Sequence, residues 1–147
     1  EHMETAIRWA DEAGIGVRGM FMVGNFGETP ETLEETIRFV RRNPIKDFHV
    51  TFFTPMPGTG SFVQWKRHGN WTADATEGDT TSLHTGPTYV PHGMTRAELM
   101  RYQKRLYRAF LKPSTLVYHF KKLFKPAVAR QVLRGGVAFL RYSLTSR

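Results

Sequence analysis

The most constraining feature of the chain is an apolar segment that runs through a glycine turn directly into a helix, within residues 19–31. Thr29 is a favourable N-cap residue, and Pro30 suits the first helical position. A second apolar segment, over residues 48–54, follows that helix and stops at Pro55. This order predicts two parallel strands joined by a crossover helix, and α/β proteins bind ligands at the carboxyl edge of such strands.

The other elements follow from apolar spacing and from helix-ending residues. In chain order we expect a helix over 3–13, a strand over 15–23, the crossover helix ending at Asn43-Pro44, a strand over 48–53, a short helix over 61–67, helices starting at Thr95, Ser114 and Pro126, and a last apolar segment over 137–144. The chain thus divides into an α/β part (1–67), a long irregular loop (68–94) and a basic helical extension (95–147). Two parallel strands alone do not make a stable sheet, so we expect the C-terminal part of a longer α/β protein.

Positive charge is concentrated in the extension. The whole chain carries a net charge of +8, and residues 96–147 contain thirteen Lys and Arg residues against a single acidic residue, Glu98. This asymmetry predicts either a solvated helical surface or an anionic partner, such as a membrane surface or an acidic protein. We do not expect nucleic-acid binding, because no recognition module accompanies the charge.

Three segments resemble parts of one enzyme family. The turn Gly24-Asn25-Phe26-Gly27-Glu28-Thr29 resembles the GxPGET turn of radical S-adenosylmethionine enzymes, with Phe26 in place of the proline. Residues 52–59 resemble the PxPGT segment that ends the sixth barrel strand in that family. Residues 89–113 are similar to the C-terminal extension of the subfamily with an N-terminal cobalamin-binding domain, which includes anaerobic magnesium-protoporphyrin ester cyclase-like proteins.

The resemblance implies a partial (β/α)6 TIM-like barrel, of which this chain holds the fifth and sixth strands, followed by an α-helical C-terminal extension. It also implies an S-adenosylmethionine site at the strand ends, with Val23 and Gly24 beside the adenosine and Glu28 orienting polar groups. The cofactor-binding residues expected on this basis are Val23, Gly24, Gly27, Glu28, Phe53, Thr54 and Pro55, the last three lining the adenine. The long loop and the basic helices would cap the open barrel.

The chemistry implied by the resemblance is reductive cleavage of S-adenosylmethionine and attack of the 5′-deoxyadenosyl radical on a small apolar, lipid or tetrapyrrole-like substrate. Cysteine thiolates hold the 4Fe-4S cluster of such enzymes, and this chain has no cysteine. We therefore expect the cluster and the cobalamin only in an upstream part, and we expect the fragment to be inactive alone. No residue of this chain is assigned a catalytic or metal-binding role.

Other interpretations stay open at this point. The glycines can simply permit a tight turn, with Glu28 stabilising the helix end. The strand residues Met20, Phe21 and Met22 are expected in the core, and His49 faces either the barrel interior or a covering helix. A non-catalytic α/β interaction module with membrane-binding or protein-binding helices, or another barrel enzyme, would also fit. Without a cysteine, a secretion signal or a long apolar run, we expect a cytoplasmic protein, and contact of the basic helices with a membrane stays an open alternative. We also expect the fragment to self-associate through unpaired strand edges.

Overall fold

The computed structural model describes residues 2–78 and 86–123 of the 147 residues. Contacts divide the chain into two compact units, Glu1–Lys112 and Pro113–Arg147. The expected helix from Pro126 and the apolar segment over 137–144 lie outside the described residues. The described part is mixed α/β, and its two sheets have two strands each. None of its helices is both long and apolar enough to cross a lipid bilayer.

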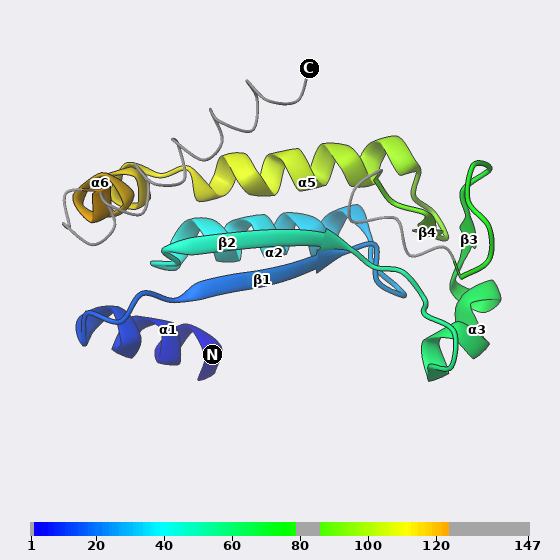
Figure 1. Cartoon of the computed structure of the whole chain (residues 1–147), viewed down its shortest axis with the longest axis horizontal. Helices are drawn as coiled ribbons and strands as arrows, with labels where there is room; N and C mark the ends of the chain where they lie inside the picture. Colours follow the sequence, from blue (N-terminus) through cyan, green and yellow to red (C-terminus); the bar gives the residue numbers. More distant parts are fainter. Residues whose placement is uncertain (1, 79–85, 124–147) are drawn as a thin grey trace, which may run out of the picture. The chain divides into compact units, whose positions relative to one another are not determined.

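The first unit opens with the predicted parallel βαβ arrangement (Figure 1). Strands β1 (Arg18–Val23) and β2 (Asp47–Phe52) pair in parallel and are joined by α2 (Pro30–Arg42). The predicted cap is confirmed, because the Thr29 side chain accepts the Thr32 N–H and Pro30 begins the helix. The first unit therefore contains the strand–helix–strand order on which the sequence interpretation depends, although a barrel is not established by two strands.

Helix α1 (His2–Glu12) precedes β1, and the chain between them is not extended from residue 15 as we predicted. Gly14 has a φ of +75°, and the Ile15 N–H donates to the Ala10 carbonyl at 2.8 Å. This is the hydrogen-bond pattern of a glycine-terminated helix end. Ile15 therefore belongs to the end of α1, and β1 begins three residues later, at Arg18.

Helices α2 and α5 (Arg96–Phe110) cover one face of the β1–β2 sheet. Side chains alternate along β2, so that Phe48, Val50 and Phe52 are buried while His49 is exposed. The buried cluster on this face consists of Val23, Leu33, Ile37, Val40, Ile45, Phe48, Val50, Phe52, Met94, Leu99, Tyr102, Leu106 and Ala109. Helix α5 lies against α2 and β2, so it contributes to the core of the unit (Figure 1).

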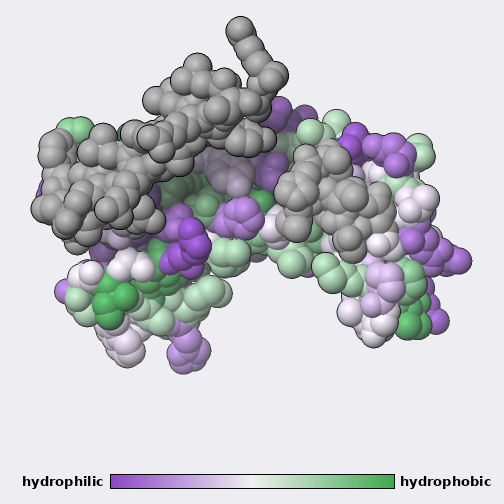
Figure 2. Space-filling model, viewed as in Figure 1, coloured by the Kyte–Doolittle hydropathy of each residue, from purple (hydrophilic) through white to green (hydrophobic). Residues whose placement is uncertain are grey.

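The opposite face of the sheet is open within the described residues. Met20 is 67% exposed and Met22 is 49% exposed, so our prediction that both are core residues is wrong. Phe21 points the other way and contacts Phe39 and Phe48. Apolar surface is visible over α1 and β1, interleaved with polar side chains (Figure 2).

The segment over 68–94, which we predicted to be irregular, contains a short ribbon. Strands β3 (Gly69–Trp71) and β4 (Tyr89–Pro91) pair antiparallel, after α3 (Gly60–His68). Gly69 is required at this place, because a Cβ there would lie 2.2 Å from the Val90 carbonyl oxygen. In the second unit, α6 (Pro113–Leu123) begins one residue before the predicted start at Ser114.

Candidate functional site

The two predicted strand-end turns lie side by side at the carboxyl edge of the β1–β2 sheet. The register pairs Val23 with Phe52, and the Phe53 N–H donates to the Val23 carbonyl at 2.8 Å. Phe26 lies in the first turn and Phe53 in the second, and the centroids of their rings are 5.0 Å apart. The fold therefore brings together the two groups of residues that the resemblance assigned to one ligand.

The predicted residues differ in accessibility. Val23, Gly24 and Pro55 are buried, Gly27 is exposed, and Glu28, Phe53 and Thr54 are half-buried. Gly24 has a φ of +90°, and a Cβ there would be 3.3 Å from a methyl group of Leu99 on α5. The turn needs glycine at this position both for its backbone conformation and for its contact with α5.

The Glu28 carboxylate folds back into its own turn. Its Oε2 atom accepts a hydrogen bond from the Gly24 N–H. Burial raises the pKa of Glu28, and hydrogen bonds from the backbone N–H groups of Gly24 and Asn25 partly oppose that rise. The Gly24 N–H is therefore already engaged within the turn, because the chain itself supplies the acceptor.

An aromatic cluster covers the second turn. Phe26 stacks on His68 at 4.5 Å, and Tyr89 lies edge-on to both Phe26 and Phe53. We define the aromatic cluster as Phe26, Phe53, Trp65, His68, Trp71 and Tyr89, which come from both turns, from α3 and from the ribbon. Sequence reasoning assigned only Phe53 of these to a site. Residues 68–94 contain only two of the chain's Phe, Trp and Tyr residues, Trp71 and Tyr89, so aromatic density gave no signal for this cluster.

Tyr89 is the centre of the aromatic cluster. Its side chain is fully buried, and its hydroxyl donates to the Trp65 carbonyl at 3.2 Å. Loss of hydration raises the pKa of Tyr89 to about 12, so the phenol is neutral at physiological pH. The hydrogen bond from the Tyr89 hydroxyl to the Trp65 carbonyl links β4 to α3. Because its pKa is raised, this phenol is not suited to transfer a proton near neutral pH.

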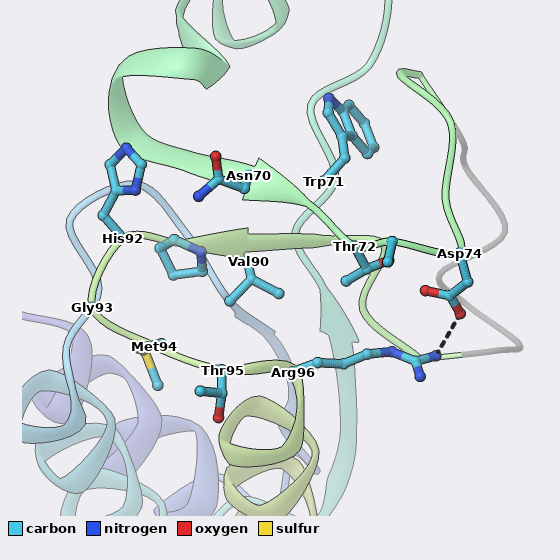
Figure 3. A pocket seen from close by; sticks show the side chains of 12 residues that line it. Asn70, Trp71, Thr72, Asp74, Val90, His92, Gly93, Met94, Thr95 and Arg96 are labelled. Atoms are coloured by element: carbon cyan, nitrogen blue, oxygen red, sulfur yellow. Dashed lines mark ion pairs between the residues drawn. The ribbon is translucent and has the colours of Figure 1, made fainter.

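A separate open pocket of about 450 Å³ lies between the ribbon and the start of α5 (Figure 3). Val90 and Thr72 point toward the side of Thr95 and Arg96, whereas Trp71 points to the other side of the ribbon. Arg96 pairs with Asp74 at 3.5 Å and donates to the Pro87 carbonyl. None of the predicted cofactor-binding residues lines this pocket.

The residues present fit the implied cofactors only in part. A cysteine-held iron–sulfur cluster does not fit, because the chain has no cysteine. Within the described residues, no group of three or more His, Asp or Glu side chains is placed to hold a metal ion. For S-adenosylmethionine the strand edge offers the half-buried Phe53 as an apolar wall. The N–H groups of Gly24 and Phe53 are already engaged, so this chain supplies at most one side of such a site.

Comparison with known proteins identifies no relative of this chain. No protein-family model, no curated protein and no solved structure matches the chain. The resemblance to radical S-adenosylmethionine enzymes therefore depends on the three sequence segments and on their placement in the fold.

Proposed function

We propose that this chain is the C-terminal part of a radical S-adenosylmethionine enzyme and contributes one wall of its cofactor site. In this proposal β1 and β2 are the fifth and sixth barrel strands, and residues 23–28 and 53–55 face the cofactor. The enzyme would act on a small apolar, lipid or tetrapyrrole-like substrate. The cluster and any cobalamin would be held by an upstream polypeptide segment.

The observation that carries the proposal is the difference between the two outer edges of the sheet. The Asp47 N–H donates to the Val17 carbonyl, and the Phe53 N–H donates to the Val23 carbonyl. In a parallel ladder, this means that the backbone N–H and C=O groups of the odd-numbered residues in each strand point toward the other strand. The even-numbered residues of both strands therefore direct their N–H and C=O groups outward.

On β2 the outward N–H and C=O of Val50 are capped by side chains of α5. The Val50 N–H donates to the Tyr107 hydroxyl at 3.4 Å, and the Val50 carbonyl accepts from Gln103 at 3.2 Å. On β1 the outward Met22 carbonyl accepts from the Asn25 side chain of the following turn at 3.2 Å. Among the described residues, no hydrogen bond reaches the outward N–H and C=O of Met20, in the middle of the strand. This is the pattern expected if β2 is the last strand of a barrel and β1 continues to a further strand. Self-association through an unpaired edge stays a prediction for β1 and is not expected for β2.

The open sheet face is the second supporting feature. A barrel requires helices on the outer face of its strands and a lumen on the inner face. Helix α2 covers one face, whereas the exposed side chains of Met20, Met22 and His49 lie on the other. In the proposed assembly these three side chains would line the lumen.

Cofactor binding by the full chain tests the proposal directly. Backbone amide NMR signals would be followed while S-adenosylmethionine or 5′-methylthioadenosine is added. We expect weak binding, roughly millimolar, since one wall of the site is present, with shifts centred on residues 23–28 and 53–54. Phe53→Ala should abolish these shifts, and Val63→Ala, at an exposed position on α3, should retain them. Shifts confined to other residues would remove the cofactor assignment.

The proposal that the chain continues an upstream cluster-binding segment can be tested separately. The reading frame that directly precedes Glu1 should encode a CxxxCxxC segment, because the cluster needs three thiolates that this chain lacks. A preceding frame without that segment would overturn the proposal even if adenosine compounds bind.

A non-catalytic interaction module is the second candidate. It is favoured by exposed apolar side chains on α6, which a barrel site does not need. Absence of adenosine binding at the strand ends, together with retained binding to a membrane or protein surface, would favour this candidate.

A further inference from the structure

Helix α6 exposes apolar side chains on one side. Leu116, Val117 and Phe120 are 56%, 51% and 61% exposed. Phe120 follows Leu116 by four positions and Val117 by three, so it neighbours both on the helix surface and the three form one face. We call these three residues the α6 apolar face. It borders a shallow apolar groove completed by His119.

The polarity of α6 is inverted with respect to an ordinary surface helix, which buries its apolar side. Thr115 is buried, and Tyr118 and His119 are half-buried. Thr115, Tyr118 and His119 therefore lie on the covered sides of α6, whereas Leu116, Val117 and Phe120 lie on an exposed side. A helix of this kind gains free energy when its exposed face enters an apolar environment.

Helix α6 lies in a strongly basic part of the sequence. Helix α6 contains no acidic residue, and the exposed Lys121 lies next to Phe120 in sequence. Over residues 96–147 the sequence has thirteen Lys and Arg residues and only one acidic residue. An apolar face within a strongly basic segment is complementary to a surface that is apolar inside and anionic outside.

We propose that α6 docks this chain on an anionic lipid bilayer. The α6 apolar face enters the boundary between head groups and acyl chains, and Lys121 and neighbouring basic residues meet the lipid phosphates. A nucleic acid would account for the charge but not for the exposed Leu116, Val117 and Phe120. A protein partner would need an acidic rim around an apolar groove, which is a more restrictive requirement. This inference is independent of the proposed cofactor site.

Vesicle co-sedimentation of the full chain tests the inference. We expect sedimentation with phosphatidylcholine vesicles that contain phosphatidylglycerol, and little with phosphatidylcholine alone. Phe120→Ser should weaken the partition about tenfold, because a phenyl group no longer enters the bilayer. Lys121→Glu should also weaken it about tenfold at low salt, and salt should reduce that difference.

Two controls separate docking from a folding defect. Val63→Ser changes an apolar side chain that is more exposed than Phe120, on α3 in the other unit, and should leave the partition unchanged. Phe120→Trp keeps a large apolar group and should bind at least as well as the wild type. The inference is overturned if neutral vesicles bind equally well or if Phe120→Ser binds like the wild type. It is also overturned if light scattering shows a dimer that Phe120→Ser converts to a monomer, since a second copy would then cover the face.

Discussion

The ring of Phe26 meets the ring of Phe53 edge-on, with centroids 5.0 Å apart and planes at 73°. This contact joins the turn after β1 to the turn after β2. Phe26 stands where the resembling motif has proline, and its ring also stacks on His68. The departure from the motif therefore has a structural reason, because the phenyl ring links the sheet edge to α3.

Replacing Phe26 by alanine should lower the free energy of unfolding by about 1–3 kcal/mol. The value is below that of a fully buried phenylalanine, since the ring is only half-buried. Urea unfolding followed by circular dichroism measures the change. Val63→Ala is the matched control and should shift the midpoint very little, because Val63 is 85% exposed. Equal effects of the two variants would show that the aromatic cluster does not stabilise the unit.

Two glycines of the same turn allow backbone conformation and packing to be separated. Gly24 and Gly27 both have positive φ, so alanine is strained at either position, by about 1 kcal/mol. Only at Gly24 would the new Cβ meet a side chain, that of Leu99 at 3.3 Å. Gly24→Ala should therefore be more destabilising than Gly27→Ala in the same urea experiment. A reversed order would show that the turn is not pressed against α5.

The parts of the fold that were predictable depend on local signals. Thr29 and Pro30 fix the start of α2, and the apolar runs on either side of that helix predict β1 and β2. Parallel pairing follows from their order and short connections. These features need no knowledge of distant residues, so the sequence alone was sufficient.

The errors concern features that depend on distant residues. Met20 and Met22 are apolar strand residues, and which sheet face is covered depends on the placement of α2 and α5. The ribbon of β3 and β4 has three-residue strands, which are too short to show alternation. The aromatic cluster combines four separate segments. Two missed features were within reach of local reasoning. The Glu28 carboxylate binds the Gly24 N–H four positions away, and the Ile15 N–H binds the Ala10 carbonyl five positions away at the end of α1.

Arg105 of α5 binds Glu34 of α2 with both of its terminal nitrogens. This hydrogen bonding lowers the pKa of Glu34, so the pair stabilises the fold above the ordinary glutamate pKa. That stabilisation is lost as the pH falls through the lowered folded pKa. Arg105→Ala should reduce the melting temperature at neutral pH, and the reduction should shrink in acid and in high salt. Arg101→Ala should have a smaller effect, because Arg101 pairs with Glu98 on its own helix. Equal effects would show that the α2–α5 pair adds nothing specific.

Tyr89→Phe removes the hydroxyl that donates to the Trp65 carbonyl. We expect a loss of about 1 kcal/mol at neutral pH, the usual net contribution of one hydrogen bond. The pKa of Tyr89 is raised to about 12, so the folded state disfavours its ionised form. The wild type should therefore lose stability as the pH rises from the ordinary tyrosine pKa of 10.0 toward 12, and Tyr89→Phe should lack this component. Tyrosinate absorbance should show one late-titrating group in the wild type that the variant lacks.

Glu28→Gln tests whether burial or hydrogen bonding dominates at the glycine turn. A glutamine amide oxygen can accept the Gly24 N–H in place of the carboxylate, so the turn should be retained. Burial is the larger influence and raises the pKa of Glu28 above the ordinary value of 4.5. A raised carboxyl pKa means that the folded state favours the protonated form, so the wild type loses stability as the pH rises from about 4.5 through the folded pKa.

The glutamine variant has no such loss. Its free energy of unfolding, measured in urea across this pH range, should therefore rise relative to that of the wild type and then stay level at higher pH. The opposite slope would mean that the N–H groups of Gly24 and Asn25 stabilise the carboxylate more than burial disfavours it. In that case the turn would be an anion-binding loop filled by its own glutamate.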